Sequence, residues 1–195
     1  MSLNSAFTIS RYFPPTGLGP MGRKQAYIGT AVRAAEARRS AASAATTNIA
    51  LIKLLDDALR DELDCVLRYM SYGLVARRMD VPEEADRFQR YAGEESNHAR
   101  RLNARIVQLG GEANAKSGLV DWCSAVVLDV APDLPGMIRS SLSAEGASID
   151  IYCRILNQVI GHDVPTQELI EEILLEELQH AEELWARSSE LTRVN

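Results

Sequence analysis

The sequence predicts an all-α fold, an antiparallel four-helix bundle with a long crossover between its second and third helices. Four long segments carry apolar residues at steps of three and four, which is the helical period. No segment shows the sustained alternation that marks a half-buried strand. Two of the three connections are short, whereas the middle one has about twenty residues, enough to run the length of a bundle.

The first hairpin is expected to pair a helix from about Thr47 to Met79 with a second helix that begins at Pro82. Asp80-Val81-Pro82 interrupts the first pattern, and proline suits the first turn of a new helix. Gly110-Gly111 ends the second helix. The apolar stripes are Leu51, Leu55, Ala58, Val66, Tyr69 and Gly73, then Phe88, Tyr91, Leu102, Ile106 and Leu109.

The second hairpin is expected to pair a helix from about Leu134 to Ile160 with a fourth helix opened by Asp163-Val164-Pro165. Gly161 separates the two. The tripeptide repeats the one in the first hairpin, which suggests two copies of one helical unit. The stripes are Ile138, Leu142, Ile149, Tyr152, Leu156 and Val159, then Ile170, Ile173, Leu174, Ala181 and Leu184.

The crossover covers residues 112–133, and residues 119–128 within it could form a short helix. Trp122 in this segment has two interpretations. It either contacts another subunit, where aromatic residues are enriched, or covers the core of its own bundle.

Charge divides the 195 residues into a basic N-terminal extension, 1–48, and the four-helix bundle, 49–195. Residues 1–55 hold seven of the 21 basic residues and one of the 27 acidic ones, while the net charge of the whole chain is −6. The extension is interpreted as a segment that packs on a neighbouring subunit, as an arm for DNA, or as a targeting segment.

Cysteine content and hydropathy predict a cytoplasmic protein without a membrane segment. Cys65, Cys123 and Cys153 are odd in number and far apart, as in proteins of reducing compartments. No apolar run reaches 18 residues, and the first 20 residues lack the apolar core of a secretory signal.

Each apolar stripe carries a carboxylate at its centre, and two stripes add a histidine one turn later. Residues three apart lie on the same helix face, so these polar groups should point into the core. The two hairpins contribute them at nearly equal spacing, 33 and 32 residues between the glutamates. The candidate metal ligands are Glu62, Glu95, His98, Glu145, Glu177 and His180.

Four buried carboxylates without a compensating charge would destabilise a domain whose net stability is about 5–15 kcal/mol. No lysine or arginine lies in the same stripe segments. Two divalent cations would neutralise the four glutamates, and the neutral imidazoles would complete the coordination. Mixed carboxylate and imidazole ligands suit iron or manganese better than thiophilic metals.

At these residues the chain resembles the ferritin-like superfamily, in particular bacterioferritins and Dps-like mini-ferritins, over about residues 50–190. The matching motifs are Asp61-Glu62-Leu63, Glu95-Ser96-Asn97-His98-Ala99, Glu145 and Glu177-Leu178-Gln179-His180. Tyr69 matches a tyrosine beside the iron pair in such proteins.

The resemblance implies a ferroxidase that binds two iron ions per subunit, oxidises Fe(II) to Fe(III) with O2 or H2O2, and stores the product in a protein shell. It further implies that Glu95 and Glu177 bridge the metals and that Glu62 and Glu145 are terminal ligands. His98 and His180 are expected to be terminal nitrogen ligands.

Departures from bacterioferritins refine this expectation, and the longer connection between the second and third helices, with the N-terminal extension, looks more like Dps-like mini-ferritins. Ser96 occupies the position of the haem-ligating methionine, so haem binding is not expected. Fifteen residues follow His180, too few for the fifth helix of 24-subunit ferritins, so twelve subunits are favoured and twenty-four are the alternative. Cys123 and Cys153 could form the thiol pair that some mini-ferritins carry near the site.

Two other functions fit parts of the sequence. A Dps-like protein that binds and protects DNA would use the basic extension, although the acidic bundle would repel phosphate. A rubrerythrin-like peroxidase without iron storage would use the same metal ligands, but rubrerythrins usually carry paired CxxC motifs that are absent here.

Overall fold

The computed structural model describes residues 44–112 and 133–193, and within these ranges it contains four α-helices and no strand. The helices are α3 (Ala44–Arg78), α4 (Pro82–Gln108), α6 (Leu134–Val159) and α7 (Val164–Arg193). Their limits lie within a few residues of those expected from the apolar periodicity. The predicted all-α four-helix bundle is confirmed.

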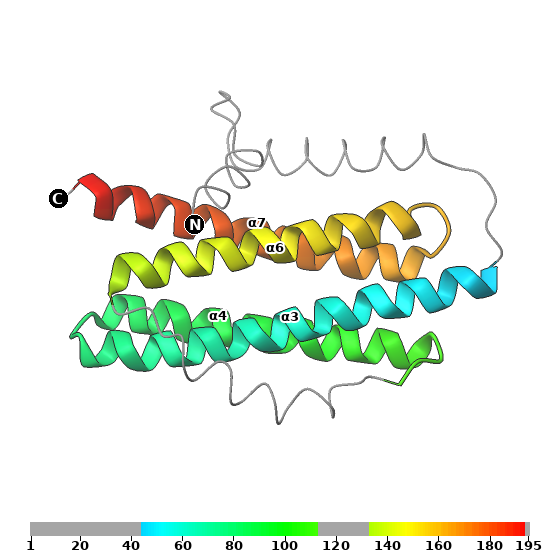
Figure 1. Ribbon diagram of the computed structural model, residues 1–195, viewed down its shortest axis with the longest axis horizontal. Helices are drawn as coiled ribbons and strands as arrows, with labels where there is room; N and C mark the ends of the chain where they lie inside the picture. Colours follow the sequence, from blue (N-terminus) through cyan, green and yellow to red (C-terminus); the bar gives the residue numbers. More distant parts are fainter. Residues whose placement is uncertain (1–43, 113–132, 194–195) are drawn as a thin grey trace.

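The direction of the helices confirms the long crossover. Figure 1 shows α3 and α4 running antiparallel, as do α6 and α7, whereas α4 and α6 run in the same direction. The chain must therefore cross from one end of the bundle to the other between α4 and α6. α3 packs on α4 and α6, and α7 packs on α6 and, at fewer places, on α4.

The two short turns differ although both contain the sequence Asp-Val-Pro. In the α3–α4 turn, Asp80 adopts a left-handed conformation with φ 58° and caps no helix. In the α6–α7 turn, Gly161 takes the left-handed position with φ 74°, and Asp163 accepts a hydrogen bond from the backbone N–H of Thr166. The repeated tripeptide thus marks equivalent places in the chain but not equivalent local structures.

The core of the bundle is formed by the predicted apolar stripes, with Tyr69, Tyr91, Phe88 and Tyr152 among its largest buried side chains. Burial of this apolar surface supplies most of the driving force for packing the helices. The polar residues at the centre of the stripes are therefore surrounded by apolar side chains on either side along the bundle.

Several sequence-based expectations fall on residues that the structure does not describe. These are the basic extension up to residue 43, the possible helix at 119–128, and the positions of Trp122 and Cys123. Cys65 is buried in α3 and Cys153 is partly buried in α6. None of the described helices is long and apolar enough to cross a membrane.

Candidate metal centre

The six predicted ligands come together in the middle of the bundle. Each helix contributes one glutamate, and α4 and α7 each add a histidine one turn later. All six residues are between 0% and 2% exposed. The helices therefore orient both Glu-x-x-His pairs inward, as the helical spacing predicts.

The donor atoms form two overlapping groups. Within each group, the carboxylate oxygens and the imidazole nitrogen lie within 4.8 Å of one another. Glu95 and Glu177 belong to both groups. One group is completed by Glu62 and His98, and the other is completed by Glu145 and His180. This arrangement provides two neighbouring positions with two shared carboxylates between them.

The histidines present Nδ1 to the centre. Nδ1 of His98 lies 2.9 Å from oxygens of Glu95 and of Glu177, and 3.4 Å from Glu62. Nδ1 of His180 lies 3.1 Å from Glu95 and 3.8 Å from Glu145. Nδ1 is thus the ring nitrogen available to a metal in both groups.

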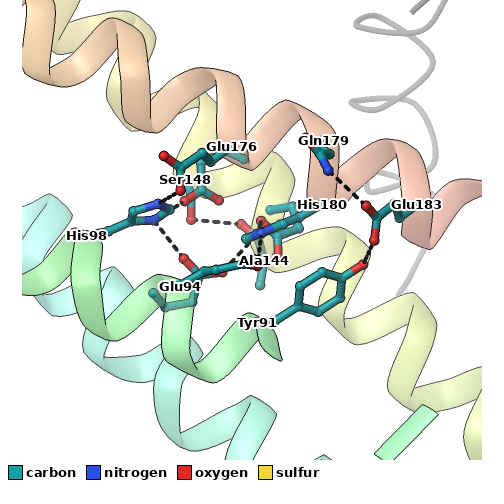
Figure 2. Close-up of polar contacts among 12 residues, drawn as sticks. Tyr91, Glu94, His98, Ala144, Ser148, Glu176, Gln179, His180 and Glu183 are labelled. Carbon is teal, nitrogen blue, oxygen red and sulfur yellow. Dashed lines mark hydrogen bonds and ion pairs between the residues drawn. The ribbon is translucent and has the colours of Figure 1, made fainter. Parts of the chain in front are cut away.

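The Nε2 atoms point outward to carboxylates of the other hairpin. Nε2 of His98 lies 3.0 Å from Glu176, and Nε2 of His180 lies 2.8 Å from Glu94. Figure 2 shows both contacts. Such outer hydrogen bonds fix the tautomer and orientation of a metal-binding imidazole. The stripes did not reveal these partners, although each immediately precedes the glutamate of a Glu-x-x-His pair.

Two buried tyrosines contact the two glutamates that belong to only one group. The phenol of Tyr69 in α3 donates to Glu145, and the phenol of Tyr152 in α6 donates to Glu62. Tyr69 was expected beside the site, whereas Tyr152 was assigned to the core. A signal was present in the sequence, because each tyrosine lies seven residues after the glutamate of its own helix.

The pKa values show how the metal-free centre balances its charge. Burial raises the pKa of Glu62 to about 8 and raises the pKa of Glu177 well above its usual value. Burial alone would also raise the pKa of Glu95, but hydrogen bonds from His180 and His98 outweigh it and hold that pKa well below its usual range. Protons therefore occupy part of the centre when no metal is bound.

The same contacts keep the imidazoles charged. Burial would lower the pKa of His98, but hydrogen bonds to Glu62 and Glu95 raise it to about 11. Burial likewise opposes a charge on His180, yet Glu145, Glu94 and Glu95 together raise its pKa far above the ordinary value. Two protonated histidines thus offset carboxylates in the metal-free protein.

Several inward atoms remain unsatisfied despite this balance. Oε1 of Glu95, Oε2 of Glu145, Oε1 of Glu177 and Nδ1 of His180 are buried, and among the described residues they have ion-pair contacts of 2.9–3.8 Å but no partner in hydrogen-bond geometry. Unsatisfied buried polar atoms are costly and normally indicate a missing partner. Because all four converge on the two overlapping donor groups, the residues fit a pair of hard or borderline divalent cations.

The position that the resemblance assigns to the haem-ligating methionine holds Ser96. Ser96 lies exposed on α4. Its hydroxyl is not among the side chains that ligate haem iron, which are histidine, cysteine, methionine and tyrosine.

A four-helix bundle with four carboxylates and two imidazoles at its centre has the arrangement of the di-metal carboxylate proteins. A family model described as a ferritin-like domain matches residues 52–194. The chain belongs to this ferritin family.

Solved structures of bacterioferritins share the fold. The Desulfovibrio desulfuricans protein, described with a diiron site in different catalytic states, is 26% identical, with a TM-score of 0.68 over 78% of this chain and 86% of that one. The Rhodobacter capsulatus bacterioferritin, described with a metal-free dinuclear site and haem iron, is 20% identical, with a TM-score of 0.67 over 75% and 88%. No curated sequence matches.

Proposed function

We propose that the protein is a ferroxidase that stores or detoxifies iron in the cytoplasm. Fe(II), as substrate, binds at a di-iron centre inside each subunit and is oxidised to Fe(III) by O2 or H2O2. The observation that carries this proposal is the set of buried, unsatisfied donor atoms in two overlapping groups. Family membership supports the same conclusion.

The residue roles follow from which donors are shared. Glu95 and Glu177 bridge two iron ions, because they belong to both groups. Glu62 with His98, and Glu145 with His180, complete one position each. Four carboxylates against two divalent cations give no net charge, which removes the penalty of burying the glutamates. The side chains thereby hold the two ions close together where one oxidant can accept an electron from each.

The outer carboxylates Glu176 and Glu94 keep each imidazole in the tautomer that offers Nδ1 to iron. A metal bound at Nδ1 leaves Nε2 protonated, and that N–H donates to the outer carboxylate. The surrounding apolar core excludes bulk water from the centre. No haem takes part, since Ser96 replaces the residue that would hold it.

A homo-oligomeric shell would receive the Fe(III) product, with twelve subunits favoured over twenty-four. The outer face of α3 supports contact with a second copy, because Met70 and Leu74 are 55% and 66% exposed there, beside the partly buried Leu63 and Leu67. An antiparallel copy centred on Leu67 would place Asp57 opposite Arg77. These two groups have opposite charges at the ends of an apolar stripe.

Anaerobic titration with Fe(II), followed by exposure to O2, tests the proposal. We expect two Fe(II) bound per chain and rapid appearance of ferric absorbance. Glu62→Gln should remove one binding equivalent, whereas the matched variant Glu168→Gln, on the exposed side of α7, should retain both. Wild-type protein that neither binds two Fe(II) nor oxidises them would contradict the function.

Native mass measured with and without iron separates storage from the alternatives. A shell of twelve chains that retains many ferric ions supports storage. A small assembly that turns over H2O2 without retaining iron would indicate a rubrerythrin-like peroxidase. A gel shift of DNA that disappears at higher salt would indicate DNA binding.

A further inference from the structure

Helices α4 and α7 carry their Glu-x-x-His pairs in the same register, so residues around the centre correspond between them at a distance of 82 positions. The corresponding pairs are Glu95 with Glu177, His98 with His180, and Glu94 with Glu176. The correspondence ends one turn before each glutamate, where α4 has Tyr91 and α7 has Ile173. Both residues are 0% exposed. The two halves of the centre therefore differ at a buried position that no metal ligand occupies.

Tyr91 lies against the imidazole of His180. The centres of the two rings are 4.4 Å apart, and their planes are tilted by 46°. The outer nitrogen of the same imidazole, Nε2, lies 2.8 Å from Glu94. The imidazole is thus contacted on its ring by a phenol and at its outer edge by a carboxylate. Both contacts restrict the rotation that would carry Nδ1 away from Glu95 and Glu145, which belong to the same donor group.

Tyr91 is itself held by contacts from three other side chains. Its hydroxyl donates to Glu183 of α7 at 2.9 Å, as Figure 2 shows. The guanidinium of Arg90 lies over its ring, 4.6 Å from the centre, and the ring of Tyr69 is 5.2 Å away. The phenol ring is therefore a fixed surface against which the imidazole rests. Ile173, at the corresponding place in α7, has neither an aromatic ring nor a hydroxyl group to provide such a surface.

We propose that Tyr91 is a positioning residue for one of the two metal positions. It serves the His180 position, which Glu145 completes, and it does not serve the His98 position, which Glu62 completes. The inference rests on the proposed di-metal function. Tyr91 keeps the imidazole of His180 oriented before a metal arrives, so less freedom is lost when the metal binds. The His180 position therefore binds a divalent cation more tightly, and releases it more slowly, than it would without this ring.

The experiment measures Co(II) at each position separately in the assembled full-length protein. Glu62→Gln leaves the His180 position, and Glu145→Gln leaves the His98 position. Tyr91→Ile is introduced into each of these proteins, which gives α4 the residue that α7 carries at the corresponding place. Binding is followed by the visible absorption of Co(II), and release is followed by competition with a chelator.

In the Glu62→Gln protein, Tyr91→Ile should weaken Co(II) binding about tenfold and speed its release, the upper end of what an aromatic pair contributes. In the Glu145→Gln protein, the same substitution should leave binding unchanged. Tyr91→Phe should weaken the His180 position about threefold, because the ring stays but its hydrogen bond to Glu183 is lost.

Tyr72→Ile is the matched control. Tyr72 is a similarly buried phenol, 2% exposed, and its ring packs on Phe88 with the ring centres 5.5 Å apart. The substitution should cost the metal-free bundle a comparable amount of stability, measured by thermal unfolding, yet leave Co(II) binding unchanged in both proteins. A loss of stability by itself would then not account for weaker binding in Tyr91→Ile.

Unchanged Co(II) binding by Tyr91→Ile in the Glu62→Gln protein would overturn the proposal. Equal weakening in the Glu62→Gln and Glu145→Gln proteins would overturn it too, because Tyr91 would then support the bundle as a whole. If Tyr91→Ile does not assemble, Tyr91→Phe decides, and unchanged binding at the His180 position is again the contradicting result. Wild type that binds no Co(II) would instead refute the metal centre on which the proposed function depends.

Discussion

The His98 and His180 sides of the centre share one motif but differ in what surrounds it. On the His180 side, Glu94 is held by Arg90 at 3.1 and 3.3 Å, and the ring of Tyr91 lies 4.4 Å from the imidazole, centroid to centroid. Arg90 and Tyr91 both bind Glu183, which Figure 2 shows beside His180.

On the His98 side, the outer carboxylate is less restrained. Glu176 has Arg101 3.8 Å away, and Arg101 makes its shorter contact with Glu172. The two hairpins thus place two imidazoles in equivalent positions, yet the side chains around them would allow the two proposed metal positions to differ in affinity. Equivalent ligands in the two hairpins therefore do not guarantee equivalent metal sites.

The largest expected effect comes from removing Glu95, which both donor groups share, because this change should impair both proposed metal positions at once. Glu95→Ala should slow rapid Fe(II) oxidation by more than about 100-fold, because it removes a direct ligand where even outer partners contribute about 10–100-fold. Stopped-flow absorbance after mixing with O2 measures this. Loss confined to one of two binding steps would show that Glu95 serves only one metal position.

Glu95→Ala also tests the metal-free protein. A count of buried carboxylates predicts that removing one is stabilising. The contacts predict the opposite, because Glu95 lies 2.9 Å from His98 and 3.1 Å from His180, and both are protonated without metal. We expect a loss of about 3 kcal/mol in thermal or denaturant unfolding, the scale for breaking a buried ion pair.

Substituting the outer carboxylates should separate the two sides. Glu94→Gln should weaken binding at the His180 position by about 100-fold, and Glu176→Gln should weaken the His98 position by about 10-fold, within the range for such partners. The stronger effect is expected where Arg90 holds the carboxylate. Two-step titration with Co(II), followed by its visible absorption, distinguishes the positions. Equal effects would mean that the surrounding side chains do not distinguish them.

Metal binding should release protons and tighten as pH rises between about 6.5 and 8. The raised pKa of His98, about 11, and of Glu62, about 8, mean that both hold protons which metal must displace. The histidine contribution to metal-free stability is present below its unfolded pKa of about 6.5 and is lost as pH rises through about 11. Calorimetry with Zn(II) in two buffers of different ionisation enthalpy counts the protons. Binding without proton release would contradict the pKa shifts.

The smallest effects should come from the arginines. Arg90→Ala should lower affinity at the His180 position several-fold and bring it closer to the His98 position, whereas Arg101→Ala should change little. Both are partly exposed, so each should alter unfolding free energy by about 1 kcal/mol or less. The same Co(II) titration checks both. A larger effect from Arg101→Ala would reverse the comparison.

Periodicity made the helices and the six inward residues predictable, because each lies on a face fixed by its own helix. Glu94, Glu176 and Tyr152 were not assigned to the site, since their roles depend on contacts between helices. Glu94 looks like a solvated residue until α7 brings His180 beside it. Tyr152 looks like core until α3 places Glu62 within reach. Such contacts depend on how neighbouring helices are rotated and staggered, which a stripe on one helix does not specify.

The polar contacts between α4 and α7 have a mechanical consequence. Polar contacts join these helices along much of their length, from Arg187 with Glu84 at one end, through the histidines, to Arg105 with Thr166 at the other. Several of these contacts are ion pairs between partly exposed side chains, such as Arg90 with Glu183 and Arg101 with Glu172. High salt should therefore weaken the packing of α4 on α7 before that of the other helix pairs, and bound metal should hold these two helices together. Backbone amides of α4 and α7 would then exchange hydrogen with solvent faster in the metal-free protein, while those of α3 stay protected.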